Sequence, residues 1–261
     1  MSNTTPKESS DHLEQRKTLI KLEAAIDALK VHTLDASQLD ELNIKRQPMA
    51  LNKDSDLKPH FFAPQSNLPR PSKKLIRKTV EHLNNKDAFT DAMSRAHHFE
   101  RDWSDYAFSD TKFTCENELW RSMDVGDYNP FKHLYKYDKP DFGVFKIMDI
   151  PGKESPHMKA VIYHGLEGED STVCRGELLI ILRLMLSQLR KVRLLHHKVA
   201  PVNLDCLIMG KNARLLESYF DGESLVLHSS DLYELSEQTT TSVVFKGFAD
   251  WFLGEPAGNT L

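Results

Sequence analysis

Hydrophobic residues recur every three or four positions near the start of the chain. Leu19, Leu22, Ile26 and Leu29 fall on one side of a helix, which is the pattern of an amphipathic helix with one apolar stripe. Such a stripe packs against the chain's own domain or against a protein partner, and two heptads are too few to define a coiled coil. Residues 1–12 are polar and charged, so we expect a disordered tail.

Prolines interrupt the pattern after the N-terminal helix region, residues 13–45. The five prolines are Pro48, Pro59, Pro64, Pro69 and Pro71. Because proline breaks regular helix and central strand, we expect residues 46–71 to form an extended linker or a wrapping segment. Phe61 and Phe62 are the residues expected to anchor it to the main domain, residues 72–261.

Helical periodicity returns after this segment. Ser72 is expected to cap one helix, Asp87 a second, and a third is expected over residues 115–123. The second helix carries His97 and His98. Neighbouring side chains on a helix point about 100° apart, so these two histidines are not expected to hold one metal ion.

The sequence pattern changes at Phe131, where short runs of β-branched and aromatic residues begin. Strands are predicted over residues 131–137, 142–150, 158–166, 199–210, 213–221 and 223–229, with Asp221-Gly222 as a hairpin turn. Residues 171–195 form an unusually apolar helix, and a last amphipathic helix covers residues 243–253. This order predicts an α+β fold: a mixed β-sheet around one apolar central helix, preceded by a helical N-terminal arm.

Composition narrows the class of protein. The net charge is −4 and the pI about 6.3, which argues against coating nucleic acid by bulk electrostatics. Three cysteines without a CxxC pattern suit a reducing compartment. The N-terminus has no apolar signal region, and the stretch Leu178–Leu189 is too short to span a bilayer. We therefore expect an intracellular protein, cytoplasmic or nuclear, that does not associate with membranes.

Charged residues flank two of the predicted strands. Asp141 follows Pro140 at the start of one strand, and Lys159 opens the next. Metal-dependent phosphodiester cleavage uses carboxylates to hold a cation and a lysine to orient water. Paired strands would bring Asp141 and Lys159 to one edge, and Glu116 or Glu118 on a preceding helix would complete the site.

On these residues the chain resembles the restriction-endonuclease-like PD-(D/E)XK superfamily over about residues 113–253. The resemblance implies Mg²⁺ or Mn²⁺ as cofactor, Asp141, Lys159 and Glu118 as catalytic residues, and Asp141, Glu118 and His157 as metal ligands. His157 is the main departure, because the family pattern has Asp or Glu there. Histidine brings no negative charge for Mg²⁺, which prefers oxygen ligands.

The C-terminal half also resembles a group of uncharacterised proteins of filamentous fungi, some of which lie near secondary-metabolite genes. The segments that carry this resemblance are Arg175–Leu178, Ala200–Val202, Leu216–Gly222 and Trp251–Gly254. It implies no chemistry and no roles for individual residues.

Other constellations are weaker. Cys174 at a helix start could pair with His164 or His197 as a nucleophile, although a buried inert thiol also fits. Arg175 and Glu177 are open to two interpretations, a buried pair or two solvated first-turn residues. The remaining histidine candidates for metal, His196, His197 and His228, lack acid or cysteine partners at ligand spacing. The chain has no Walker, Rossmann, G-x-S-x-G or kinase signature.

The sequence thus predicts a catalytically degenerate nuclease-like domain that acts as a binding or accessory protein in fungal secondary metabolism. One alternative is an active nuclease that uses Mg²⁺ or Mn²⁺. Another is an interaction protein that presents Leu19, Leu22, Ile26 and Leu29 to a protein partner.

Overall fold

The computed structural model describes residues 8–85, 91–110, 119–126, 131–152, 155–208 and 210–261. The helices are α1 (Ser10–Asp27), α2 (Ala36–Glu41), α3 (Lys73–Asn84), α4 (Ala92–Ser104) with the π-helical turn η1 (Asp105–Asp110), α5 (Arg175–Leu189), the 3-10 turn η3 (Val192–Leu194) and α6 (Gln238–Phe252). The strands of the main sheet are β2 (Ile44–Pro48), β4 (Arg121–Met123), β5 (Phe142–Asp149), β6 (Met158–His164), β8 (Val202–Ile208), β9 (Asn212–Phe220), β10 (Leu225–Ser229) and β11 (Tyr233–Glu234).

The main sheet is mixed, with the strand order β2-β10-β9-β8-β6-β5-β4, and β11 pairs with β9. β6 runs parallel to β8, and β2 runs parallel to β10, while the other neighbours are antiparallel. The parallel pair β6 and β8 is joined through α5, as parallel strands require a crossover connection. The predicted α+β fold with a mixed sheet is confirmed.

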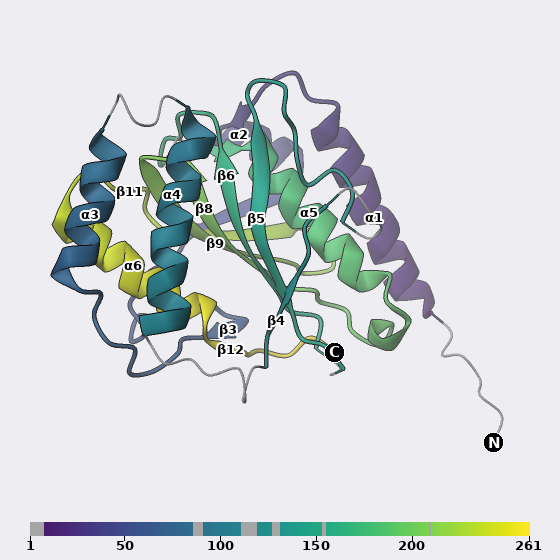
Figure 1. Cartoon of the computed structure of the whole chain (residues 1–261). Helices are drawn as coiled ribbons and strands as arrows, with labels where there is room; N and C mark the ends of the chain where they lie inside the picture. The colour runs from purple at the N-terminus through teal and green to yellow at the C-terminus, as the bar shows by residue number, and fades with distance from the viewer. Residues whose placement is uncertain (1–7, 86–90, 111–118, 127–130, 153–154, 209) are drawn as a thin grey trace.

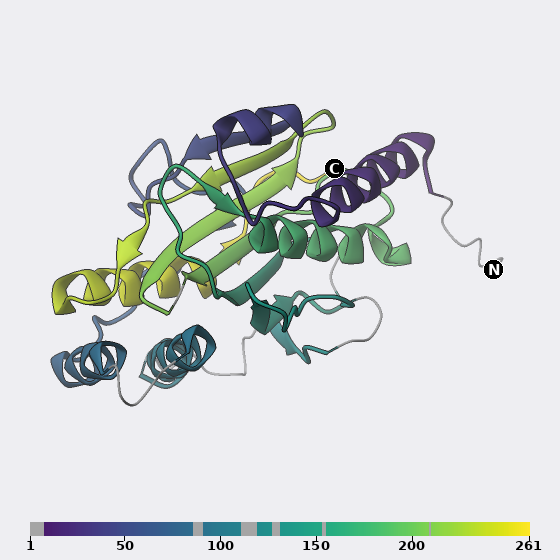
Figure 2. The same cartoon turned by 90° about the horizontal axis from the view of Figure 1, so that it is seen from above.

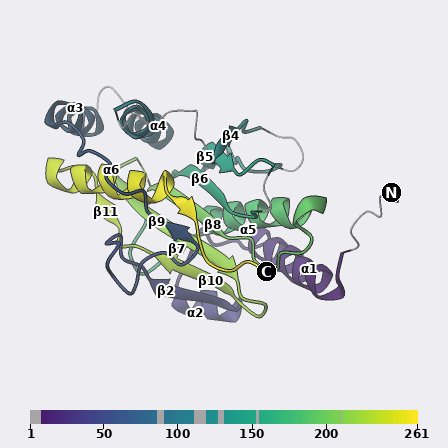
Figure 3. The same ribbon diagram turned by 90° about the horizontal axis from the view of Figure 1, so that it is seen from below.

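Helices cover both faces of the sheet (Figure 1; Figure 2). α5 lies on one face and α1 packs on its outer side, so α5 is enclosed between the sheet and α1. This position explains why α5 is apolar all round rather than along one stripe. α3, α4 and α6 cover the opposite face, where they enclose a second hydrophobic cluster (Figure 3). In β8, Leu204 faces the first cluster and Leu207 the second.

The N-terminal stripe is covered by the chain itself. Leu19 and Ile26 are fully buried in the cluster with α5, and Leu22 and Leu29 pack against it partly exposed. This corrects the expectation that a protein partner occupies the stripe, because α5 takes that place. The expected disordered tail is corrected in part: α1 begins at Ser10 with Ser9 as its N-cap, while residues 1–7 lie outside the described residues.

The proline-rich segment, residues 46–71, contains the end of one strand and a second short strand, and the rest of it wraps along the domain. β2 extends to Pro48, and proline fits there because the strand lies at the edge of the sheet. The strand β3 (Phe62–Ala63) pairs with β12 (Glu255–Pro256) outside the main sheet. Phe61 and Phe62 are buried, as expected of anchors.

Three element predictions were wrong or lie outside the described residues. Residues 131–137 form turns rather than a strand, apart from an isolated bridge between Lys136 and Phe142. The end of the expected helix 115–123 is the strand β4. Asp91 caps α4, whereas the expected cap Asp87 lies outside the described part of the chain.

The remaining boundaries agree with the patterns more closely. Ser72 caps α3 as predicted. Gly222 adopts a φ of 100° in the turn between β9 and β10, which glycine tolerates without strain. Before α5, the short strand β7 (Val173–Cys174) pairs with β1 (Thr33–Leu34). None of the helices in the described ranges combines the length and the apolarity that crossing a bilayer requires.

Candidate functional site

The register of β5 and β6 decides where the predicted nuclease residues lie. Phe142 pairs with His164 at one end of these strands, and Met148 pairs with Lys159 at the other. Asp141 precedes Phe142 and therefore lies at the His164 end. Five strand positions separate Lys159 from His164, which corresponds to roughly 17 Å. The structure thus corrects the expectation that Asp141 and Lys159 meet at one edge.

Lys159 holds the end of a helix. Its side chain is fully buried, and its Nζ donates to the carbonyl oxygens of Trp251, Phe252 and Gly254 at 3.0, 2.8 and 2.7 Å. Trp251 and Phe252 lie in the last turn of α6, whose carbonyls lack partners within the helix, and Gly254 follows the helix. The ammonium also lies 4.1 Å from the ring centroid of Trp120. Burial lowers the pKa of Lys159 well below its usual range, against the opposing charge of Asp205.

Replacing Lys159 with methionine tests this structural role. We expect a loss of about 2–3 kcal/mol in the free energy of unfolding, because the carbonyls at the end of α6 lose their donor inside the protein. Chemical denaturation measures the loss. Lys45→Met is the control, since Lys45 lies on an exposed part of β2 and forms an exposed ion pair with Asp221; a change of less than about 0.5 kcal/mol is expected there. Equal losses in the two variants would contradict the capping role.

His157 also lies at the Lys159 end of β6, directly before Met158. It is buried, its Nε2 donates to the carbonyl oxygen of Ala257 at 2.9 Å, and its Nδ1 accepts from the Ser155 hydroxyl at 2.9 Å. Burial lowers the pKa of His157 to about 4. Both ring nitrogens are engaged, so His157 ties the C-terminal segment to the sheet and is not placed beside Asp141.

Asp141 has a different set of neighbours. Gly165 follows β6, donates its backbone N–H to the carbonyl oxygen of Asp141 at 2.8 Å, and approaches the Asp141 carboxylate so closely that a Cβ there would collide with it. His164 is buried and stacks on Phe142 with ring centroids 5.8 Å apart. The residues of β6 nearest this end are Ile162, Tyr163 and His164. They supply neither a carboxylate nor a lysine.

The His164 ring is held in a neutral form. Burial lowers the pKa of His164 to about 4, although the negative charges of Glu177 and Asp141 act in the opposite direction. Its Nδ1 has no hydrogen-bond partner among the described residues. Gly176 makes room for the ring, since a Cβ at this position would lie 2.6 Å from His164 Nε2.

A divalent metal ion does not fit these residues. Mg²⁺ needs several oxygen ligands in near-octahedral geometry, and the described residues contain no group of three or more His, Cys, Asp or Glu that could hold a metal. Asp141 and His157 lie at opposite ends of β6, and Glu116 and Glu118 lie outside the described residues. The histidine pairs His97-His98 and His196-His197 likewise belong to no such group within the described ranges.

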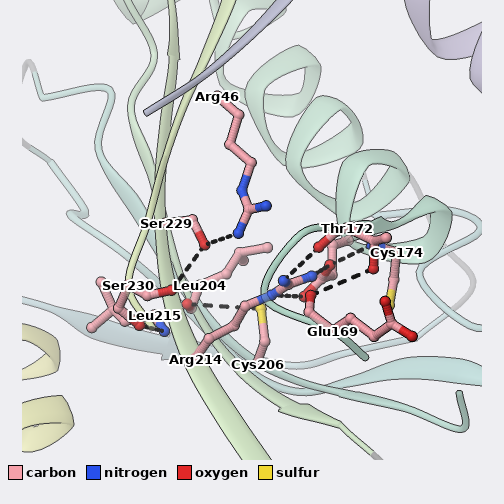
Figure 4. A network of polar contacts seen from close by, with 11 residues as sticks. Arg46, Glu169, Thr172, Cys174, Leu204, Cys206, Arg214, Leu215, Ser229 and Ser230 are labelled. Carbon is pink, nitrogen blue, oxygen red and sulfur yellow. Dashed lines mark hydrogen bonds and ion pairs between the residues drawn. The ribbon is translucent and has the colours of Figure 1, made fainter. Parts of the chain in front are cut away.

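A buried ion pair joins the start of α5 to the sheet (Figure 4). Glu177 accepts from Arg214 Nε at 2.9 Å and from Arg214 Nη2, and both side chains are fully buried. Glu177 also accepts from the backbone N–H of Cys174 at 2.7 Å and so caps α5. Arg214 Nη1 donates to the carbonyl oxygen of Thr172 at 2.7 Å. The ion pair thereby connects the start of α5, the strand β9 and the loop at Thr172.

The two charges of this pair stabilise each other. Burial raises the pKa of Glu177, but the charge and hydrogen bonds of Arg214 outweigh burial and leave the pKa below its usual value. Burial lowers the pKa of Arg214, and Glu177 reverses this so that the pKa is raised. Both groups are therefore ionised at neutral pH.

The sequence indicated Glu177 but not its partner. Arg175, the expected alternative, donates to the backbone carbonyl oxygens of Asp27 and Leu29 instead. The signal for Arg214 is a charged residue directly before the apolar pair Leu215 and Leu216 of β9. The register of β8 and β9, which pairs Arg214 with Cys206, was needed to place Arg214 on the face of the sheet that α5 covers.

The cysteine nucleophile is not supported by its surroundings. Cys174 and Cys206 are buried, and burial raises the pKa of both thiols well above the usual range. A reactive thiol needs a lowered pKa and access to solvent. His197 is engaged elsewhere, because its Nδ1 forms a hydrogen bond with Thr260 Oγ1 at 2.8 Å. It follows η3, beyond the C-terminal end of α5, whereas Cys174 precedes the N-terminal end. Cys174 is therefore a structural residue.

No family model, curated protein or solved structure matches the chain. The residues themselves therefore carry the argument about function.

Proposed function

We propose that the chain is a nuclease-like domain without phosphodiester chemistry that acts as a binding or accessory protein. The observation that carries the proposal is the separation of Asp141 from Lys159 along β5 and β6. Metal-dependent hydrolysis needs ligands and a positive group that converge on one phosphate. Here the lysine caps α6, and Asp141 lies beside a neutral histidine.

The order of the elements supports the nuclease-like part of the proposal. Asp141 precedes β5, β6 returns beside it, and the apolar helix α5 then leads to β8, parallel to β6. This is the order that the resemblance to the PD-(D/E)XK superfamily leads us to expect. The role in fungal secondary metabolism rests on the sequence resemblance and remains a prediction.

A cleavage assay tests the loss of chemistry. Plasmid, single-stranded DNA and RNA are incubated with the full chain and Mg²⁺ or Mn²⁺, beside an Asp141→Asn variant. We expect no cleavage by the wild type above the background of the variant, because the described residues at Asp141 include no second carboxylate that is free to hold a cation. Metal-dependent cleavage that disappears in Asp141→Asn would refute the proposal and restore the active nuclease.

A further inference from the structure

A second polar region lies beside the buried ion pair. A pocket of about 370 Å³ opens between α2 and β2 on one side and the loops at residues 170–171 and 229–231 on the other. Leu39 and Ile44 supply apolar lining. The volume is at the lower end of the range for small-molecule sites, so the pocket suits a small ligand.

Arg46 is the cation of this pocket. Its side chain is half-buried on β2, on the face of the sheet that also carries Arg214 (Figure 4). Arg46 Nη2 donates to Ser229 Oγ at 3.2 Å. Within the described residues this is the single hydrogen bond of its guanidinium, and no carboxylate there lies within ion-pair distance. A guanidinium has five N–H donors, so most of them are available to a ligand.

The adjacent network explains why Arg46 has no ion-pair partner among the described residues. Glu177 is bound in the two-pronged contact with Arg214 and in the cap of α5. Burial and the positive charge of Arg214 lower the pKa of Arg46, while Glu177 and Asp170 act in the opposite direction. A partly desolvated cation without a paired anion is unfavourable, and an anionic group in the pocket would relieve that cost.

The exposed lining has the opposite charge. Asp40, Asp170 and Asp231 are exposed where they line the pocket. Asp170 is fixed by accepting the backbone N–H of Leu232 at 2.6 Å. Three acidic groups around one half-buried cation disfavour a polyanion and favour a ligand that carries a cationic group beside its anionic one.

We propose that this pocket binds a small amino-carboxylate, a molecule with a carboxylate at one end and an ammonium group at the other. The carboxylate pairs with the fork of Arg46 and with the hydroxyl of Ser229, since guanidinium and carboxylate match in a two-pronged geometry. The ammonium group is attracted by the exposed aspartates. This site is separate from Asp141 and stands whether or not the chain cleaves nucleic acid.

Calorimetric titration of the full chain with a series of ω-amino carboxylates, from glycine to 6-aminohexanoate, tests the inference. The series keeps both charged groups and varies only their separation. We expect at least one member to bind more tightly than the alkyl carboxylate and the alkylammonium ion of equal length. Methyl phosphate, which is anionic without an ammonium group, is expected to bind more weakly.

Matched variants locate the site. Arg46→Gln is expected to weaken the best ligand about tenfold or more, since a charge-assisted hydrogen bond is lost. Lys45→Gln removes the same charge from the neighbouring position, where Lys45 pairs with Asp221, and is expected to change the affinity less than about twofold. Arg46→Lys keeps the charge without the fork and should give an intermediate loss. Asp231→Asn should weaken the amino-carboxylate, whose ammonium group loses an attracting charge, and should not weaken the plain carboxylate.

Each other outcome overturns the inference. No binding anywhere in the series would reject the pocket as an amino-carboxylate site. Equal binding by the carboxylate of the same length, or tighter binding by methyl phosphate, would show a plain anion site. Equal losses in Arg46→Gln and Lys45→Gln would place the ligand elsewhere, provided that circular dichroism shows both variants folded.

Discussion

Arg214→Met is expected to lower the free energy of unfolding by about 3–5 kcal/mol, the range for removing one member of a buried ion pair. Glu177 would keep its negative charge or take up a proton in a fully buried position, with its main partner gone. The cap of α5 depends on the same carboxylate, so the start of the central helix is loosened as well. Arg214 also holds the loop at Thr172.

A double-mutant cycle measures the interaction energy between Glu177 and Arg214 apart from the effect of each substitution alone. Chemical denaturation is measured for Arg214→Met, Glu177→Gln and the double variant. The double variant should be more stable than the sum of the single losses predicts, because no uncompensated charge remains. Strictly additive losses would contradict a coupled pair. Arg183→Met is a useful control, since Arg183 forms ion pairs with Glu23 and Asp27 nearer the surface and should lose less.

Acidification from pH 6.5 to pH 4 is expected to destabilise the protein by about 6 kcal/mol through two buried histidines, about 3 kcal/mol from each. His157 and His164 have pKa values lowered by burial from 6.5 to about 4 in the folded chain. They lie at opposite ends of β6, so their effects should add.

The direction follows from which state binds protons. Above pH 6.5 both rings are neutral in the folded and the unfolded chain, and the stability is complete. Between pH 6.5 and pH 4 the unfolded chain takes up protons that the folded chain refuses, so stability falls as the pH falls. Below about pH 4 these two residues contribute no further loss. Glu177, whose pKa is lowered by Arg214 from an ordinary value of 4.5, adds a loss that begins near pH 4.5 and continues at lower pH.

Urea denaturation at several pH values measures this loss. The double variant His157→Gln, His164→Leu should show a much flatter dependence between pH 6.5 and pH 4, even if it is less stable at neutral pH. His196→Gln replaces an exposed histidine and should keep the wild-type dependence. An unchanged pH dependence in the double variant would mean that other groups cause the acid sensitivity.

Long periodic segments were predictable because their pattern depends on local burial. The apolar run of α5 and the alternating runs of β8 and β9 occur where they were expected. Residues 131–137 resemble a strand because they are rich in aromatic residues, yet in the structure they form turns. Phe131 and Leu134 are buried in the cluster with α5 all the same, so an apolar run that reaches the core need not be a strand.

The candidate site was less predictable than the fold. Asp141 and Lys159 stand at the starts of successive strands in sequence, and the inference assumed that pairing of the two strands brings them to one edge. Antiparallel strands place the start of one beside the end of the other, so Asp141 meets His164 instead. The partner of Glu177 depended in the same way on the sheet register, which brings β9 beneath the start of α5.

The sequence by itself determined the α+β class, the apolar central helix, the stripe of α1 and the anchors Phe61 and Phe62, because burial imposes a period on each segment. Tertiary structure alone decided that α5 covers the apolar stripe of α1, that the Lys159 ammonium binds the carbonyls at the end of α6, and which charged side chains form pairs. It also left Arg46 in a pocket where none of the carboxylates that the structure describes forms an ion pair with it. Such features depend on strand register and on contacts between residues distant in the chain, and no local pattern encodes those distances.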